Sequence, residues 1–181
     1  IVGSLEIWDE IYEEVRKKGL LPEDIVLGSA LVDMYAKCGM LEKAQLVFDQ
    51  MTMRNAMSWN ALITGYIDRG LFEEALRCLD EMQAENISPD AITCVCILKA
   101  CGSTKSTLKG RETHAEITRE GLLEKNVLIG NALVDMYAKC GLLTEAQDVF
   151  ELLPIRNTVS WSTLISGYTE HRHPEKSFNC F

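Results

Sequence analysis

One ten-residue string occurs twice in this chain and limits the fold more than any other feature. ALVDMYAKCG begins at Ala30 and again at Ala132, 102 positions later (132 − 30). The same offset relates Phe48 to Phe150. A period of this length is too long for one supersecondary unit, so shorter repeats must lie inside it.

The apolar pattern inside the period predicts pairs of short helices. Apolar residues recur at helical spacing over residues 30–35 and again over residues 41–48. Gly39 lies between the two stretches, where a glycine commonly ends a helix. No stretch alternates with the two-residue period of a strand.

The helix pairs define repeats of uneven length. Repeats of 31, 35, 36 and 31 residues follow from expected starts at Ile25, Ala56, Ala91, Val127 and Thr158. Such pairs bury their apolar faces only by stacking on their neighbours. The sequence therefore predicts an all-α fold, a right-handed α-solenoid of stacked antiparallel helical hairpins.

Both ends of the chain are expected to be incomplete repeats. Residues 1–24 hold a single second helix, expected at about Leu5 to Lys18, and the last repeat stops at Phe181. We therefore expect a piece of a longer array. No apolar run reaches the roughly 20 residues of a membrane span, so no membrane partner is expected.

Composition and motifs argue against an enzyme. The chain of 181 residues carries a formal charge of −9, which disfavours indiscriminate binding to nucleic acid. His114-Ala115-Glu116 matches half of a zinc deaminase signature, but no Pro-Cys-x-x-Cys follows. Cys94, Cys96 and Cys101 lack zinc-ligand spacing. Neither a catalytic residue nor a metal nor a cofactor is predicted.

Three strings give the chain a specific resemblance. NALVDMYAKCGLL, SWNALITGYIDRGLFEEAL and ISPDAITCVCILKACG resemble the S-, P- and L-type units of plant organellar pentatricopeptide repeat proteins of the PLS subclass. The resulting order is a partial L-type repeat (1–24), then S (25–55), P (56–90), L (91–126), S (127–157) and a truncated P-type repeat (158–181). Tetratricopeptide repeats form a similar superhelix, but their Trp-Leu-Gly-Tyr spacing is absent.

The resemblance implies binding of single-stranded RNA, with one base read by each repeat. In that family the fifth and last residues of a repeat face the base, and the apolar second residue packs on it. The implied reading residues are Ser29, Asn55, Asn60, Asp90, Asn131, Asn157 and Ser162, and the implied packing residues are Val26, Met57, Leu128 and Val159. In the L-type repeat, Val95 occupies the fifth position and has no polar atom to read a base with.

The chemistry of the last residue suggests a base preference. A carboxylate such as Asp90 accepts the ring N–H of uracil or guanine, whereas the amide of Asn55 donates to the bare ring nitrogen of adenine or cytosine. In the family, a hydroxyl at the fifth residue goes with a purine and an amide with a pyrimidine. Together with the last residue, the resemblance therefore implies 5′-A-U-N-C/U-purine. Lys37 and Lys139 are candidates for phosphate contacts, or solvated lysines favoured by a helix C-terminus.

Structural roles compete with these assignments. Asn and Ser near helix starts are common caps, and Trp59 and Trp161 are expected to pack between hairpins rather than stack on bases. The resemblance further implies selection of sites for C-to-U RNA editing in a plastid or mitochondrion, and contact with editing factors through the L-type repeat. The alternative function is a protein-interaction solenoid that binds a peptide or an editing cofactor.

Overall fold

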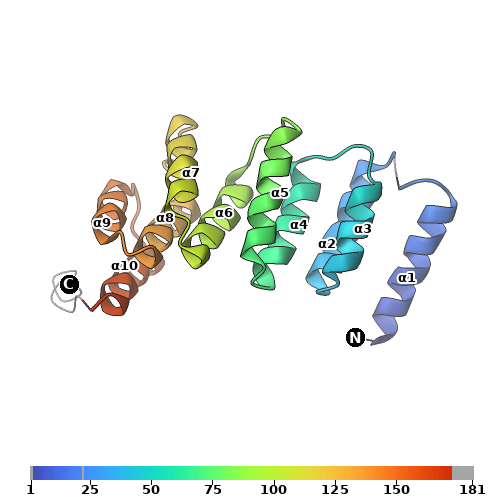
Figure 1. Cartoon of the computed structure of the whole chain (residues 1–181), viewed down its shortest axis with the longest axis horizontal. Helices are drawn as coiled ribbons and strands as arrows, with labels where there is room; N and C mark the ends of the chain where they lie inside the picture. The colour runs from blue at the N-terminus through green and yellow to red at the C-terminus, as the bar shows by residue number, and fades with distance from the viewer. Residues whose placement is uncertain (1, 22, 173–181) are drawn as a thin grey trace. The chain divides into compact units, whose positions relative to one another are not determined.

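The computed structural model of the chain describes residues 2–21 and 23–172. Over these residues it contains ten α-helices and no strand, as the apolar pattern predicted (Figure 1). In chain order the helices are α1 (Val2–Lys17), α2 (Ile25–Lys37), α3 (Leu41–Gln50), α4 (Ala56–Asp68), α5 (Phe72–Ala84), α6 (Ala91–Thr104), α7 (Thr107–Arg119), α8 (Val127–Lys139), α9 (Leu143–Leu152) and α10 (Thr158–Glu170).

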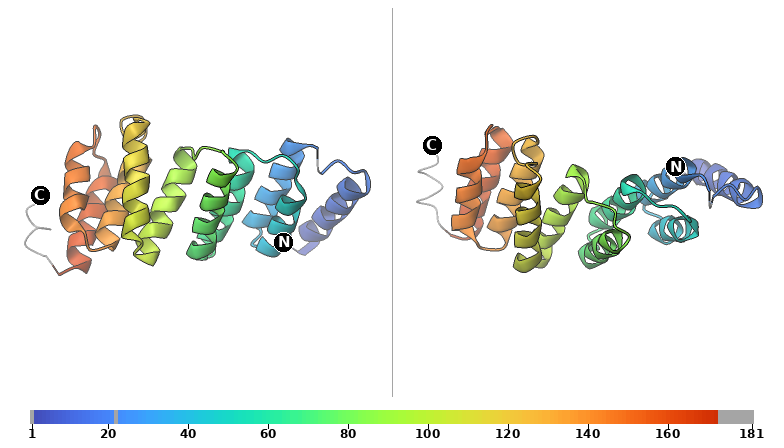
Figure 2. Two further views of the ribbon diagram at one scale, coloured as in Figure 1. Left: turned by 45° about the horizontal axis from the view of Figure 1, so that its top comes forward. Right: turned by 90° about the horizontal axis from the view of Figure 1, so that it is seen from above.

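The helices form two compact units, Ile1–Ser88 with α1 to α5 and Pro89–Phe181 with α6 to α10. In the first unit α2 packs against α3 and α4, and α4 packs against α5. In the second unit α6 packs against α7 and α8, and α8 packs against α9 and α10 (Figure 2). Within each unit, the first helices of successive hairpins therefore contact one another, which is the packing of a solenoid.

Glycines end the first helices of the duplicated segments. Gly39 and Gly141 have φ of +75° and +79°, a left-handed conformation that residues with a side chain rarely adopt. Cys38 and Cys140 precede them as C-caps. Their matching positions in the sequence favour packing as small apolar residues. That interpretation is wrong for Cys38, which is exposed, whereas Cys140 is half-buried.

Small residues let the helices approach one another closely. A Cβ atom on Gly65 of α4 would lie 2.7 Å from the Cβ of Ala36 on α2, and one on Gly167 of α10 would lie 2.6 Å from that of Ala138 on α8. The second helices carry buried alanines at corresponding places: Ala44, Ala75 and Ala146.

Aromatic pairs fill the space between consecutive hairpins. Phe48 meets Trp59 edge-on with ring centroids 4.5 Å apart, and Phe150 meets Trp161 at 4.7 Å. Trp59 is fully buried, which confirms the packing role expected for it, whereas Trp161 keeps 37% of its surface exposed. Residues 173–181, the end of the last predicted repeat, lie outside the described part of the chain.

Candidate nucleic-acid interface

Apolar side chains stand exposed at the second residue of five helices. Val26, Met57, Leu128 and Val159, the residues expected to pack on bases, are 54% to 70% exposed, and Ile92 at the same place on α6 is 59% exposed. Isolated exposed apolar residues are ordinary, but here they recur at one register. Each helix α2, α4, α6, α8 and α10 thus offers one apolar contact close to its N-terminus.

The last residue of each predicted repeat caps the helix that follows. Its Oδ1 accepts hydrogen bonds from backbone N–H groups in the first helical turn, over N–O distances of 2.9 to 3.0 Å. The capping residues are Asp24, Asn55, Asp90, Asn126 and Asn157. The capping role that competed with base reading is therefore real for all five.

Capping also orients these side chains. A backbone N–H can bond only to the oxygen of an asparagine amide, so Oδ1 faces the helix and the Nδ2 donor turns away from it. Asn55 and Asn157 consequently present a donor on the side of the amide that faces away from the helix. In Asp90 the second carboxylate oxygen occupies that side, so it presents an acceptor.

The fifth residues lie at the edge of the core. Ser29, Asn60 and Asn131 are only 2%, 8% and 7% exposed, whereas Ser162 is exposed. The Ser29 hydroxyl donates to the carbonyl oxygen of Ile25 at 2.6 Å, and the Ser162 hydroxyl donates to that of Val159 at 3.0 Å. Burial restricts the directions in which the side chains of Ser29, Asn60 and Asn131 can point.

The clearest cluster of polar contacts joins Asn131, the fifth residue of its predicted repeat, to Asn157, the last residue of the same repeat. Asn131 Oδ1 accepts the Ser160 hydroxyl at 2.6 Å, and Asn131 Nδ2 lies 3.5 Å from Asn157 Oδ1. Asn131 is on α8, whereas Asn157 and Ser160 are at the start of α10. The structure therefore brings together both reading residues predicted for residues 127–157.

The two other predicted pairs of reading residues are Ser29 with Asn55 and Asn60 with Asp90. Ser29 on α2 and Asn55 at the start of α4 belong to two helices that pack together. Asn60 lies in the first compact unit, whereas Asp90 lies in the second.

Sequence reasoning did not single out the third residue of α4, α6 and α10. Ser58, Thr93 and Ser160 are fully buried, and each completes a capping box with the preceding Asn or Asp. The signal was present as Asn/Asp-x-x-Ser/Thr just before an apolar run. In α2 and α8 that position is Leu27 and Ile129, and no capping box forms.

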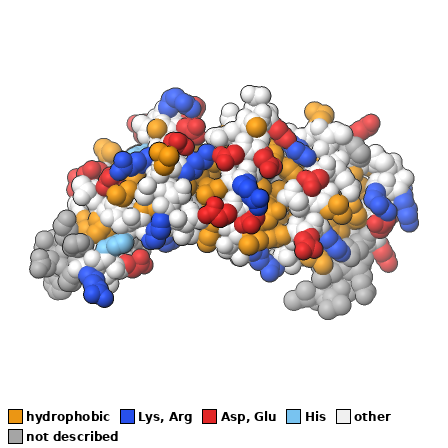
Figure 3. All heavy atoms as spheres, in the orientation of Figure 1, with side chains coloured by type: hydrophobic (Ala, Val, Ile, Leu, Met, Phe, Trp, Pro, Cys, Tyr) orange, Lys and Arg blue, Asp and Glu red, His pale blue; other side chains and the backbone are white. Residues whose placement is uncertain are grey.

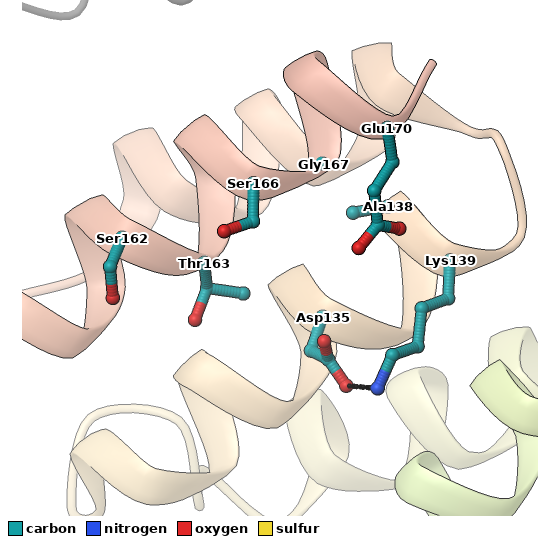
Figure 4. A pocket seen from close by; sticks show the side chains of 8 residues that line it. All are labelled: Asp135, Ala138, Lys139, Ser162, Thr163, Ser166, Gly167 and Glu170. Atoms are coloured by element: carbon teal, nitrogen blue, oxygen red, sulfur yellow. Dashed lines mark hydrogen bonds and ion pairs between the residues drawn. The ribbon is translucent and has the colours of Figure 1, made fainter.

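The two candidate phosphate ligands are held by aspartates one turn earlier. Lys37 Nζ lies 2.7 Å from Asp33, and Lys139 Nζ lies 2.7 Å from Asp135. The second pair borders a hollow of about 160 Å³ between α8 and α10, which Ser162 also lines (Figure 4). Lys105 Nζ donates to the Lys139 carbonyl oxygen and adds a further cation near this edge.

Burial shifts the pKa values of several titratable groups outside this surface. Burial lowers the pKa of His114, whose Nδ1 lies 2.9 Å from the Tyr137 hydroxyl. Burial raises the pKa of Cys78 to about 12 and those of Cys94 and Cys101 to about 11, so these thiols are not activated nucleophiles. Within the described residues, no group of three or more His, Cys, Asp and Glu could hold a metal ion.

Both signs of charge occur together on one face of the molecule. On the face drawn in Figure 3, Lys and Arg side chains are interspersed with Asp and Glu side chains over each unit. None of the helices that the structure describes has the length and apolar character needed to cross a bilayer.

Sequence comparison identifies relatives. The family model described as PPR repeat family matches residues 54–103, and the one described as PPR repeat matches residues 29–55, 131–157 and 159–181. A putative pentatricopeptide repeat-containing protein of Arabidopsis thaliana is 45% identical over 155 residues, covering 86% of this chain and 19% of the relative.

Two further relatives from the same plant carry organellar names. A chloroplastic pentatricopeptide repeat-containing protein is 38% identical over 176 residues, or 97% of this chain and 28% of the relative. A mitochondrial one is 34% identical over 182 residues, or 99% of this chain and 19% of the relative. The chain thus spans less than a third of the length of these relatives, whose names agree with the expected plastid or mitochondrial location.

Solved structures share the fold. The crystal structure of the pentatricopeptide repeat protein PPR10 from maize has a TM-score of 0.72 and 19% identity, covering 94% of this chain and 25% of that chain. PPR10 in complex with an 18-nt psaJ RNA element gives a TM-score of 0.73 at 19% identity, covering 98% and 27%. The likeness shows that the described helices have the fold of a helical repeat protein. Because the family models match in both compact units and the stacked hairpins match solved solenoids of the same kind, this chain belongs to the pentatricopeptide repeat family.

Proposed function

We propose that this chain is a sequence-specific module for single-stranded RNA, in which each repeat reads one base. The observation that carries the proposal is the Asn131–Asn157 cluster, where two amides predicted to read one base lie in contact. The exposed apolar side chain of Leu128 comes one turn before Asn131 on α8. A base stacked near such an apolar residue gains dispersion contact, while the amides bond to its edge. PPR10, which shares the fold, has been crystallised with an RNA element.

The proposed preference follows the chain from the 5′ end. Ser29 with Asn55 favours A, and Asn60 with Asp90 favours U. Residues 91–126, with Val95 at the fifth position, are indifferent. Asn131 with Asn157 favours a pyrimidine, C over U, and Ser162 favours a purine. Lys37 and Lys139 would contact phosphates after exchanging their aspartate partners for RNA.

Selection of bound RNAs from a random pool tests the proposal, and the variant Asp90→Asn tests the register. This variant replaces an acceptor by a donor, so the second base should change from U toward C. The exchange of one base-edge hydrogen bond is worth about 1–3 kcal/mol, or roughly tenfold in affinity and more. If the variant binds RNA with an unchanged second base, the assigned register is wrong.

The biological setting is part of the same proposal. The repeat lengths of 31, 35, 36 and 31 residues support membership of the PLS subclass, in which the array selects sites for C-to-U editing in a plastid or mitochondrion. In that subclass a separate deaminase performs the chemistry, so the residues of this chain would supply recognition only.

A second candidate function is binding of an organellar RNA editing factor through residues 91–126. The observation that favours it is Leu108 on α7, an apolar side chain that is 72% exposed. Filter binding with single-stranded RNAs at graded salt separates the two functions. Binding that is undetectable at low salt for every RNA removes the RNA-binding function and leaves the protein-binding one.

A further inference from the structure

The buried hydroxyl of Ser160 controls which atoms of two neighbouring amides can meet a ligand. Ser160 has no exposed surface. Its backbone N–H donates to Asn157 Oδ1 at 2.9 Å, and its Oγ accepts from the Asn157 backbone N–H at 3.2 Å. The Ser160 hydroxyl lies 2.6 Å from Asn131 Oδ1 and 3.1 Å from Asn157 Oδ1, so its one proton is donated to Asn131 over the shorter distance. One residue thus engages the carbonyl oxygens of both amides.

Engaging both oxygens leaves the two Nδ2 groups as the atoms of these amides that can donate to a ligand. Asn131 Nδ2 sits 3.5 Å from Asn157 Oδ1, a long contact that a ligand atom could replace. Asn157 itself is exposed at the surface, so a base edge can approach the cluster. Two amide donors side by side match two adjacent acceptors, and the edge of cytosine offers these as its ring N3 and its O2. Uracil presents a ring N–H at N3 instead, which faces a donor unfavourably.

We propose that Ser160 is a positioning residue that locks Asn131 and Asn157 as a two-donor reader and thereby selects cytosine over uracil. This inference rests on the proposed RNA-binding function. Without the hydroxyl, the Asn131 amide can turn over and present its oxygen. Because that oxygen accepts the N3–H of uracil, the distinction between the two pyrimidines is lost although both asparagines remain.

The first copy of the duplicated segment offers a contrast to this cluster. Ser58 occupies the matching place at the start of α4, but the fifth residue there is Ser29, whose hydroxyl donates to its own helix at Ile25. Ser58 therefore supports its cap without orienting a second amide. It provides a matched control, since Ser58→Ala and Ser160→Ala remove the same capping-box hydroxyl.

The test measures affinity of the 181-residue chain for two RNAs that differ only by C or U at the fourth predicted base. Ser160→Ala should reduce the ratio of the two affinities by about three- to tenfold, which corresponds to one hydrogen bond. Ser160→Thr should restore the ratio, because Thr93 forms the same capping box in α6. Ser58→Ala should leave the ratio within about twofold of the unsubstituted chain.

A second measurement follows the side chain directly. The NMR signals of the Asn131 side-chain amide should move in Ser160→Ala and stay in place in Ser58→Ala, with no RNA present. An unmoved signal, or an unchanged C-to-U ratio in Ser160→Ala, overturns the positioning role alone. Failure of the unsubstituted chain to bind any RNA overturns the proposed function and, with it, the assignment of a base to this cluster.

Discussion

The two copies of the duplicated segment, residues 25–55 and 127–157, share a scaffold and differ in the side chain offered at the fifth position. Both begin with a capped helix, end that helix at a left-handed glycine, and hold a lysine against an aspartate one turn earlier. Ser29 bonds within its own helix, whereas Asn131 reaches across to Ser160 on the next first helix. The comparison teaches that the repeat keeps its fold while one side chain changes its partner.

The surroundings of the two copies also differ. Tyr35 meets the ring of Tyr12 at a centroid distance of 6.2 Å, whereas Tyr137 meets that of His114 at 5.6 Å. Arg54 lies over the ring of Phe48 at 4.5 Å and donates to the Phe48 carbonyl oxygen and to Glu85. Arg156 lies over the ring of Phe150 at 5.2 Å and donates to the carbonyl oxygens of Phe150 and Glu151. Each difference predicts a separate consequence for one copy.

The largest expected effect is on stability. Phe48 is 1% exposed against the fully buried Trp59, so Phe48→Ala should lower the free energy of unfolding by about 3–5 kcal/mol. Phe150→Ala should cost less, because its partner Trp161 is already 37% exposed and loses less burial. Urea unfolding followed by circular dichroism measures both. Equal losses would show that the two aromatic pairs are energetically the same.

The next largest effect is expected on base preference, when the fifth residue of the first copy is replaced by that of the second. Ser29→Asn gives the first copy the fifth residue of the second, with Ser58 available at the place where Ser160 lies. Under the proposed function, the first base should change from A toward a pyrimidine by about tenfold. Fluorescence anisotropy with RNAs that vary at one base measures the change. Ser29→Ala is the control, and should weaken the preference for A without creating another.

A smaller effect separates the two lysines. Lys37 has 74% of its side chain exposed and Lys139 has 37%. Lys37→Ala should therefore weaken binding to all RNAs alike by about two- to threefold, with a smaller loss for Lys139→Ala. Salt titrations should show a shallower slope for both variants. Asp33→Asn should not weaken binding, since it frees Lys37 from its partner; a sequence-dependent loss in Lys37→Ala would contradict a phosphate contact.

The smallest effect is on the pH dependence of stability. Burial lowers the pKa of His114 below its ordinary value of 6.5, so the unfolded chain binds this proton more readily than the folded one. Stability contributed by the neutral imidazole is present above pH 6.5 and is lost as the pH falls through the folded pKa. His114→Tyr copies Tyr12 and should reduce the loss of thermal stability between pH 7 and pH 5. Tyr12→His should introduce such a loss beside Tyr35 of the first copy. Identical acid sensitivity in the unsubstituted chain and in both variants would contradict the role of His114 in the pH dependence.

The helices were predictable because their signals are local. Apolar residues three and four apart, a glycine after the last turn and an Asn or Asp before the first turn all act within one helix. The expected starts at Ile25, Ala56, Ala91, Val127 and Thr158 are therefore the first residues of α2, α4, α6, α8 and α10. The leading helix runs from Val2 to Lys17 rather than from Leu5 to Lys18, a shift of the kind expected at frayed helix ends.

The candidate interface was predictable only in part. Register alone placed Val26 and Leu128 at equivalent positions, and the structure shows both exposed. It did not indicate that Ser160 is buried between two asparagines, because residues 131 and 160 are 29 positions apart and their contact depends on how α8 and α10 pack.

By itself, the sequence determined the helical hairpins, their repeat and the identity of the candidate reading residues, since periodicity and caps depend on neighbours along the chain. Tertiary structure alone decided which way those side chains point. Ser29 and Asn131 occupy the same register, yet one hydroxyl turns into its own helix and one amide is held by the next. The physical reason is that a hydrogen bond between helices requires both groups within about 3 Å, and only the packing of the helices sets that distance.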